Sequence, residues 1–121
     1  MQNEISFEEA KKFSGYLEKK SKGLISKWQK RYFHILEGKI IVYADKAEDI
    51  EVKGQINIDQ ITIPVSLEDR VFSFTLETKD FVLRAKDEEE KNKWMNILKL
   101  LKNKLSDAKK KDNQNDRRMS K

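Results

Sequence analysis

The feature that most constrains the fold is a change of hydrophobic period near residue 87. Between residues 14 and 85, apolar and polar residues alternate in short runs, which is the pattern of strands with one buried face. After residue 87 the apolar spacing lengthens to three and four residues, which predicts an amphipathic helix. The sequence therefore predicts a sheet covered by one C-terminal helix. The apolar stripe of that helix consists of Trp94, Ile97, Leu98, Leu101 and Leu105.

Seven runs carry the alternating pattern, and two pairs of neighbouring runs resemble hairpins. The first hairpin is expected to turn at Glu37-Gly38 and the second at residues 78–80. Asp87 and Glu90 predict the start of the helix through a capping box, and the stripe indicates four or five turns. Seven short strands favour a mainly β fold, an antiparallel sandwich or barrel. The strands are expected at residues 14–20, 28–36, 39–44, 53–58, 61–65, 71–77 and 81–85.

The 121 residues fit one domain with an extension at each end. Residues 1–13 are expected to form the N-terminal extension, in which Ser6 and Glu9 predict a capping box for a short helix. Residues 14–104 are predicted to form the domain itself. Residues 105–121 are polar and rich in Lys and Arg, which predicts a disordered basic tail.

Charge dominates the composition. Charged residues make up 39% of the chain and the net charge is +5, which favours an anionic partner. No apolar run approaches the ~20 residues that span a bilayer, and the acidic N-terminus is not typical of a secretory signal. The chain has no cysteine, and its sequence indicates no metal-ligand cluster and no nucleophile–base pair. We expect a monomeric, non-enzymatic, cytoplasmic protein that is peripheral to membranes and needs no cofactor or metal.

Three segments resemble the pleckstrin homology (PH) domain family over about residues 14–104. Residues 15–19, GYLEK, are similar to the opening G-x-L-x-K of the family, and residues 28–33, WQKRYF, to its W-x-x-R-aromatic-Phe segment. Trp94 lies where the family has a single tryptophan in its closing helix. The resemblance implies two bent antiparallel sheets capped by that helix. It also implies a module that binds phosphoinositides, other anionic membrane lipids or a protein partner.

Successive side chains of a strand point to opposite faces of the sheet, and this alternation (side-chain parity) places two cations at the open end of the core. Leu17 and Lys19 share one face of the first strand, and Arg31 shares a face of the second with Phe33 and Ile35. Because the apolar members of both sets are core candidates, Lys19 and Arg31 should point inward at the mouth. A phosphate is a suitable partner for such cations. The alternatives are that Arg31 pairs with an internal carboxylate or is twisted outward.

The resemblance adds residues to this site. Family members that bind phosphoinositides carry Lys and Arg at positions matching Lys19 and Arg31, and often a basic residue at the position of Lys53. Gln29 stands where the tightest binders of 3-phosphorylated inositides usually have a basic residue. Val42 stands where some of those binders have a tyrosine that contacts the headgroup. The Trp-Gln pair is similar to PH domains of oxysterol-binding and related lipid-transfer proteins, which favour phosphatidylinositol 4-phosphate. The other predicted headgroup-binding residues are Lys20, Lys22, Lys27 and Lys30.

An apolar pair, Leu24 and Ile25, lies in the middle of the basic stretch 19–31. The flanking lysines would be attracted to anionic headgroups by roughly 1 kcal/mol each near such a surface. Leu24 and Ile25 are predicted to insert into the interfacial layer, each gaining up to ~1.5–3 kcal/mol if fully buried. The alternative is that Ile25 folds back onto the core.

Two other functions fit the same sequence. A protein-interaction module with the PH fold would bind anionic lipids weakly and without selectivity. A nucleic-acid-binding protein would use the basic loop and tail, but it needs exposed aromatic rings for base stacking. Most aromatic residues of this sequence alternate onto the side of their strands that is expected to face the core. We therefore expect no specific nucleic acid partner. His34 falls on the outer face of its strand and is interpreted as a surface residue.

Overall fold

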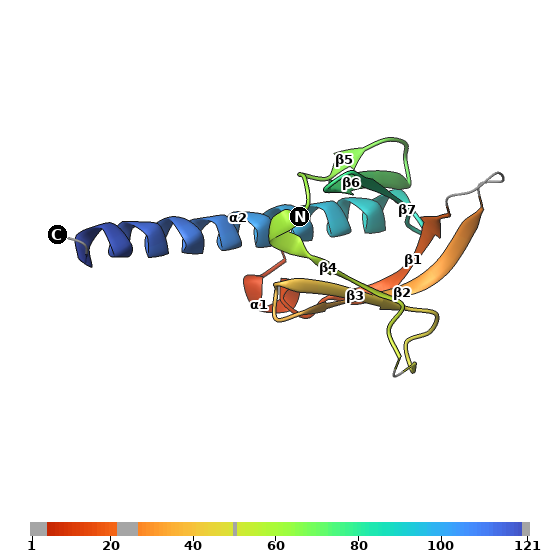
Figure 1. The fold of residues 1–121 in the computed structure, drawn as a ribbon. Helices are drawn as coiled ribbons and strands as arrows, with labels where there is room; N and C mark the ends of the chain where they lie inside the picture. The colour runs from red at the N-terminus through yellow and green to blue at the C-terminus, as the bar shows by residue number, and fades with distance from the viewer. Residues whose placement is uncertain (1–4, 22–26, 50, 120–121) are drawn as a thin grey trace.

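The computed structural model describes residues 5–21, 27–49 and 51–119, with side chains up to residue 108. The described chain forms a bent sheet that wraps around one long helix (Figure 1). In chain order the elements are α1 (Phe7–Ala10), β1 (Ser14–Lys20), β2 (Trp28–Leu36), β3 (Ile40–Ala44), β4 (Gly54–Asn57), a 3-10 turn (Ile58–Gln60), β5 (Val65–Ser66), β6 (Val71–Leu76), β7 (Lys79–Arg84) and α2 (Glu88–Met119).

The seven strands lie in the order β4-β3-β2-β1-β7-β6-β5, and neighbours pair antiparallel. β1 pairs with β2 along its whole length, but with β7 only at Glu18 and Lys19. The strands at the two ends of this order are not paired with each other, so the sheet is not closed. Figure 1 shows β5–β7 on one side of α2 and β1–β4 on the other. The predicted fold, seven antiparallel strands in a bent sandwich or barrel capped by a C-terminal helix, is confirmed in its strands and helix, and the strands form one open sheet.

The core lies between the inner face of the sheet and α2. Leu17, Phe33 and Ile35, which parity assigned to the core, are all buried. Trp94 on α2 is 1% exposed, and its ring packs edge-on against Phe13 and Phe33 at centroid distances of 4.8 and 6.4 Å. Trp94 therefore joins the helix to β2 and to the segment before β1, which is the structural role expected for it.

The turn between β6 and β7 is shorter than the sequence predicted. Glu77 adopts a left-handed backbone conformation, with φ 58°, and forms the turn together with Thr78. Lys79 and Asp80, which were expected in the turn, therefore belong to β7. This change matters because it gives Lys79 the same strand parity as Phe81, whose side chain is buried on the inner face.

β5 is the weakest strand. The sequence predicted a strand over residues 61–65, but the structure has only Val65–Ser66, and Ile61 forms an isolated bridge with Leu76. Pro64 explains the shortening, because it has no N–H to donate to the ladder. The Nζ atom of the buried Lys91 on α2 donates to Ser66 Oγ (2.8 Å), which ties this short strand to the helix.

Both helices begin as predicted. Ser6 Oγ accepts the N–H of Glu9 (3.1 Å), and Glu9 Oε1 accepts the N–H of Ser6 (3.3 Å), so the capping box of α1 is formed. Asp87 Oδ1 accepts the N–H of Glu90 (2.8 Å) at the start of α2. The predicted stripe of α2 faces the core: Trp94, Ile97, Leu98 and Leu101 are buried, and Leu105 is partly buried.

α2 ends later than expected. The sequence predicted a disordered tail from residue 105, whereas the structure continues the helix to Met119, beyond the sheet (Figure 1). Residues 106–119 contain no glycine or proline, the two residues least compatible with a helix interior. The backbone can therefore continue its helical hydrogen bonding past the last packed residue, although the apolar stripe has ended.

Candidate functional site

Lys19 lies at the open end of the sheet, which we call the mouth. It follows the buried Leu17 by two residues and so lies on the inner face of β1, as parity predicted. Its Nζ atom is 5.4 Å from the ring centroid of Phe81 and 6.0 Å from that of Tyr43. Because Phe81 belongs to β7 and Tyr43 to β3, the ammonium group lies between the two arms of the bent sheet.

Arg31 also lies on the inner face, opposite Leu17 in the β1–β2 register. Its Nη1 atom is 3.2 Å from Asp45 Oδ1, and the Nζ atom of Lys53 is 3.6 Å from Asp45 Oδ2. One carboxylate thus joins two of the predicted headgroup-binding cations. Carboxylate pairing was the alternative expected for Arg31, but Asp45 is not internal, since 46% of its side chain is exposed.

Asp45 was missed by the sequence analysis, although a signal for it exists. In the β2–β3 register Tyr32 lies opposite Ala44. Continuing that register by one residue places Asp45 opposite Arg31, on the same face of the sheet. Extending the predicted hairpin past its last apolar residue would have found the pair.

The loop after β3 is acidic and borders the mouth. It surrounds a hollow of about 710 Å³ in which Lys53 is the one cation among four carboxylates. Such a surface repels an anionic ligand, so an anion at the mouth is favoured on the side of β1 and β7. In the described ranges no group of His, Cys, Asp and Glu side chains is arranged to hold a metal ion. The hollow is lined by Asp45, Glu48, Asp49, Glu51, Val52 and Lys53.

Tyr43 lies at the mouth, close to Lys19 and within the electrostatic influence of Arg31. Its ring stacks on Phe33 at a centroid distance of 5.2 Å, and a side chain at Gly54 would overlap the phenol, so the glycine makes room for it. Burial raises the pKa of Tyr43, and the positive charge of Arg31 partly offsets that rise. Val42 had been interpreted as a missing tyrosine, but a neutral phenol does lie at the mouth, one residue later.

Lys79 is a second residue that the sequence analysis missed. Its Nζ atom lies 5.1 Å from the ring centroid of Phe81, the same ring that Lys19 approaches. The parity that identified Lys19 and Arg31 would also have identified Lys79. It was overlooked because it had been assigned to the turn.

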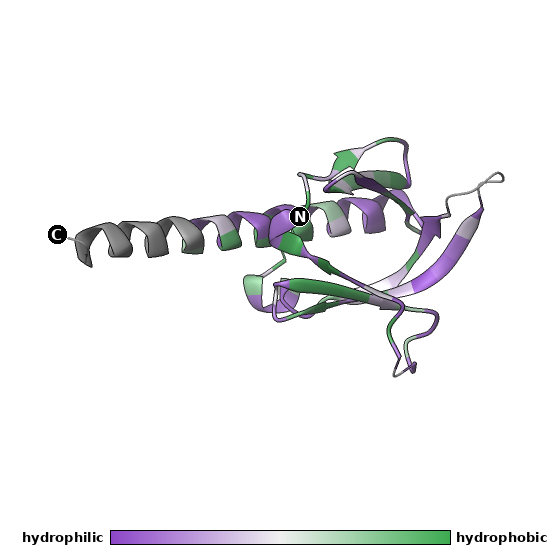
Figure 2. Ribbon diagram, in the orientation of Figure 1, coloured by the Kyte–Doolittle hydropathy of each residue, from purple (hydrophilic) through white to green (hydrophobic). Residues whose placement is uncertain are grey.

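Lys20 and Lys30 are not brought into the mouth. Lys30 Nζ lies 5.0 Å from the ring centroid of Tyr16, and Lys20 Nζ lies 5.9 Å from that of Trp28. These side chains alternate with Leu17 and Arg31 and so lie on the outer face of β1 and β2. Figure 2 shows hydrophilic residues along both strands where they approach the mouth. Cations therefore lie over the outer aromatic rings, which leaves those ring faces less available for stacking on nucleic acid bases.

An ion pair fixes the outer face between β1 and β7. Arg84 Nε donates to Glu18 Oε1 (2.7 Å), and the guanidinium lies 4.3 Å from the ring centroid of Trp28. The hydrogen bond from Arg84 is the main cause of a lowered pKa at Glu18, and the same bond raises the pKa of Arg84. Glu18 thus neutralises one cation of this face.

The ends of the basic loop are held together. Ser21 donates its N–H to the carbonyl of Lys27 (2.7 Å), and the N–H of Lys27 donates to Ser21 Oγ (3.1 Å). Lys27 therefore lies at the base of the loop, at the entrance to β2. Lys22, Leu24 and Ile25 lie outside the described residues. Their roles in headgroup binding and membrane insertion stay predictions.

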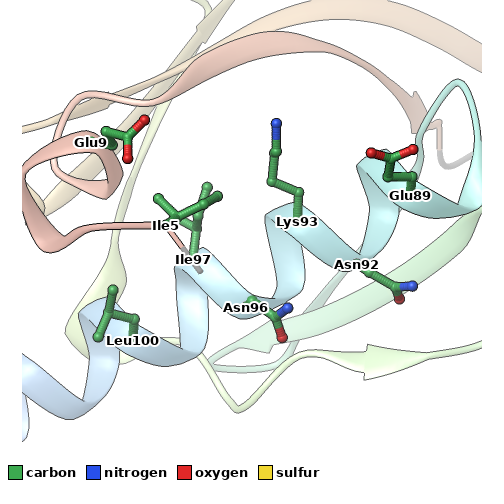
Figure 3. A pocket seen from close by; sticks show the side chains of 8 residues that line it. All are labelled: Ile5, Glu9, Glu89, Asn92, Lys93, Asn96, Ile97 and Leu100. Carbon is green, nitrogen blue, oxygen red and sulfur yellow. The ribbon is translucent and has the colours of Figure 1, made fainter. Parts of the chain in front are cut away.

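A groove of about 630 Å³ lies away from the mouth, between α2 and the segment around α1 (Figure 3). Its apolar residues are Ile5, Ile97 and Leu100, and its charged residues are Glu9, Glu89 and Lys93. Two carboxylates and one ammonium group do not favour an anion. The lining of the groove is therefore not suited to a phosphate.

Comparisons with known proteins agree with this geometry. The family model of the PH domain matches residues 11–103. The N-terminal PH domain of human ARAP2 is 30% identical, with a TM-score of 0.69, and 80% of this chain and 84% of that chain are covered. The PH domain of human oxysterol binding protein-related protein 11 is 21% identical, with a TM-score of 0.68 and the same coverage of 80% and 84%.

A third structure contains a ligand. The C-terminal PH domain of pleckstrin in complex with D-myo-Ins(1,2,3,4,5)P5 is 21% identical, with a TM-score of 0.64, covering 74% of this chain and 95% of that chain. The search of curated proteins gave no match. The family model covers well over half of the chain, and the bent sheet, the closing helix and Trp94 have the arrangement that the resemblance implied. The chain belongs to the PH domain family.

Proposed function

We propose that this PH domain binds phosphoinositide headgroups at the mouth of its sheet and thereby recruits itself, or a partner, to a membrane. The observation that carries the proposal is the convergence of inward-facing cations from three strands, Lys19, Arg31 and Lys79. Lys19 and Arg31 are partly buried, and a partly buried cation is costly to desolvate unless an anion or water accompanies it, whereas Lys79 is exposed at the mouth. The phosphates of an inositol headgroup would add negative charge that all three side chains could contact, beside the carboxylate of Asp45 that already pairs with Arg31.

The chemistry of the mouth suits equilibrium binding. Arg31 offers a planar fork of donors and the lysines offer point charges, both of which bind phosphate oxygens through charge-assisted hydrogen bonds. Pleckstrin's PH domain, which shares the fold, has been seen with an inositol phosphate, which supports this ligand class. No helix in the described ranges is long and apolar enough to cross a membrane. Attachment from the cytoplasmic side through the headgroup is the role we propose.

The basic loop has a separate part in the proposal. Lys20, Lys22, Lys27 and Lys30 would attract the domain to an anionic surface, and Leu24 and Ile25 would enter the interfacial layer. Headgroup recognition and insertion would then depend on different residues. A soluble headgroup measures the first contribution alone, whereas a vesicle measures both.

One experiment tests both contributions. Titration calorimetry with a soluble inositol phosphate and sedimentation with phosphoinositide vesicles are run on wild type, Arg31→Ala and the double variant Leu24→Ser with Ile25→Ser. Arg31→Ala should weaken binding at least tenfold in both assays, about 1.4 kcal/mol, with little change in melting temperature. The double variant should lose roughly 2–4 kcal/mol on vesicles and almost nothing with the soluble headgroup.

The matched control is Lys39→Ala, which removes an exposed lysine at the β2–β3 turn, at the opposite end of the sheet. It should bind as wild type does. Wild-type protein that binds every anionic vesicle equally, or none, would reject phosphoinositide recognition. Equal losses for the double variant in both assays would mean that the loop tip shapes the pocket instead of inserting.

A second candidate function is protein binding through the same fold, and two observations favour it. Asp45 already neutralises part of the charge of Arg31 and Lys53. In addition, Ile63, Val65 and Leu67 are each at least half exposed on and beside the edge strand β5. Such a module would show weak, unselective lipid binding in the vesicle panel. Its protein partner would bind the Arg31→Ala variant as tightly as it binds wild type.

A further inference from the structure

Two lysines from different strands approach one aromatic ring at the mouth. The ring centroid of Phe81 lies 5.4 Å from Lys19 Nζ and 5.1 Å from Lys79 Nζ. Phe74 stacks on the same ring, at a centroid distance of 5.3 Å and an interplanar angle of 19°. That stacking occupies one face of the Phe81 ring. The two ammonium groups repel each other, and an anion placed between them would be attracted to both and offset that repulsion.

Lys79 differs from the cations around Asp45. Arg31 and Lys53 already share a carboxylate, which an incoming phosphate must displace or tolerate. Lys79 takes part in none of the ion pairs formed within the described ranges. Its neighbour Asp80 accepts a hydrogen bond from Thr75 Oγ1 (2.8 Å), on the opposite face of β7.

We propose that Lys79 is a headgroup-binding residue and that Lys19 and Lys79 together bind one phosphomonoester group over the Phe81 ring. This inference rests on the function proposed for the mouth and names its ligand chemistry more narrowly. A phosphomonoester carries a charge of about −1.5 to −2 near pH 7, which matches two ammonium groups. A phosphodiester carries a single charge, so the same pair binds it less strongly. Both lysine stems are flexible enough for their ammonium groups to converge.

The test uses calorimetry with three soluble probes: inositol 1,4-bisphosphate, which has monoesters, glycerophosphoinositol, which has only a diester, and inorganic phosphate. The variants are Lys79→Gln, Lys79→Arg and the control Lys86→Gln, which removes the same charge from an exposed lysine just beyond the other end of β7. Lys79→Gln should lose about tenfold in affinity for the bisphosphate, with less loss for the diester. Lys79→Arg should keep most of the affinity, and Lys86→Gln should change it less than twofold.

A second readout separates binding from folding. The bisphosphate should raise the melting temperature of wild type and of the Lys86→Gln variant more than that of the Lys79→Gln variant, while the three ligand-free proteins melt alike. Equal binding by the Lys79→Gln and Lys86→Gln variants would overturn the inference and leave the proposed function intact. Inorganic phosphate bound as tightly as the bisphosphate would overturn the assignment to a headgroup. Wild-type protein that binds neither bisphosphate nor phosphoinositide vesicles would reject the proposed function itself.

Discussion

The mouth of the sheet has two rims of opposite charge. Residues 19–31, which end β1 and begin β2, carry six cations and no acid, whereas residues 45–53, between β3 and β4, carry four acids and two lysines. Both rims are connections between antiparallel neighbours, so their difference arises from sequence and not from topology. An anion at the mouth is attracted by one rim and repelled by the other. The net charge of the whole chain therefore does not indicate where on the chain an anion would bind.

The largest expected effect is on the free energy of unfolding, when a side chain is removed from the core that holds both rims in place. Trp94→Ala should cost ~3–5 kcal/mol in the free energy of unfolding, because it leaves a cavity next to Phe13 and Phe33. A domain of this size has only ~5–15 kcal/mol of net stability, so we expect poor expression or a large fall in melting temperature. Denaturant unfolding measures the change. The control is Asn96→Ala, an exposed residue of α2. A melt close to wild type would show that the helix does not hold the rims together.

A smaller effect is expected where the two rims meet, at Asp45. Asp45→Asn removes the carboxylate that joins Arg31 and Lys53, so both cations become available to a headgroup. A phosphate bound ~6 Å from the Asp45 carboxylate would be repelled by about 0.7 kcal/mol in a water-like dielectric. Removing that repulsion should raise the affinity for the headgroup roughly threefold.

The control for Asp45 is Glu48→Gln, which makes the same charge change in the same acidic loop, although the ion pairs of Arg31 and Lys53 in the described ranges are formed with Asp45 and not with Glu48. It should raise affinity less than Asp45→Asn does. Calorimetry with the soluble bisphosphate measures both. Unchanged or weaker binding by the Asp45→Asn variant would mean that Asp45 orders the mouth and does not compete with the ligand.

The smallest effect is expected on the outer side of the basic rim, at the pair of Glu18 and Arg84. The hydrogen bond from Arg84 lowers the pKa of Glu18 in the folded chain, so the unfolded chain binds more protons around the ordinary carboxylate pKa of about 4.3. The contribution to stability is therefore present at neutral pH and is lost as the pH falls through the lowered pKa of the folded state.

Glu18→Gln removes that dependence. Its melting temperature should be slightly below that of wild type at pH 7, and the two should converge as the pH falls through the lowered pKa of Glu18 in the folded chain. Thermal melts across the pH range measure the difference. A gap between the two proteins that stays constant down to pH 3 would show that the pair acts through packing against Trp28 and not through its charge.

The elements that the sequence predicted best are those with long, unambiguous alternation. β1 and β2 have the expected bounds, and the same alternation placed Lys19 and Arg31 on the inner face. Asp45 and Lys79 were missed because each lies next to a chain reversal, where one residue of register decides the face. At Glu77 the left-handed conformation is adopted by a residue that gives no glycine-like or asparagine-like signal.

The helix was predicted in its position but not in its length. Its start is encoded by Asp87 and its packed face by the apolar stripe, both of which are local patterns. Its end is not encoded in this way. Residues 106–108 are exposed, and residues 106–119 contain no glycine or proline that would stop the helix, so the sequence pattern favours neither outcome strongly.

The stacking of Tyr43 on Phe33 has a spectroscopic consequence. The two rings lie 5.2 Å apart at an interplanar angle of 28°, so the ring current of one shifts the proton resonances of the other. Lys19 lies beside the same tyrosine, 6.0 Å from its centroid. A ligand that draws this ammonium group or Arg31 away would change the magnetic environment of the phenol ring. The aromatic signals of Tyr43 thus offer a label-free NMR record of whether the mouth is occupied, even for ligands too weak for calorimetry.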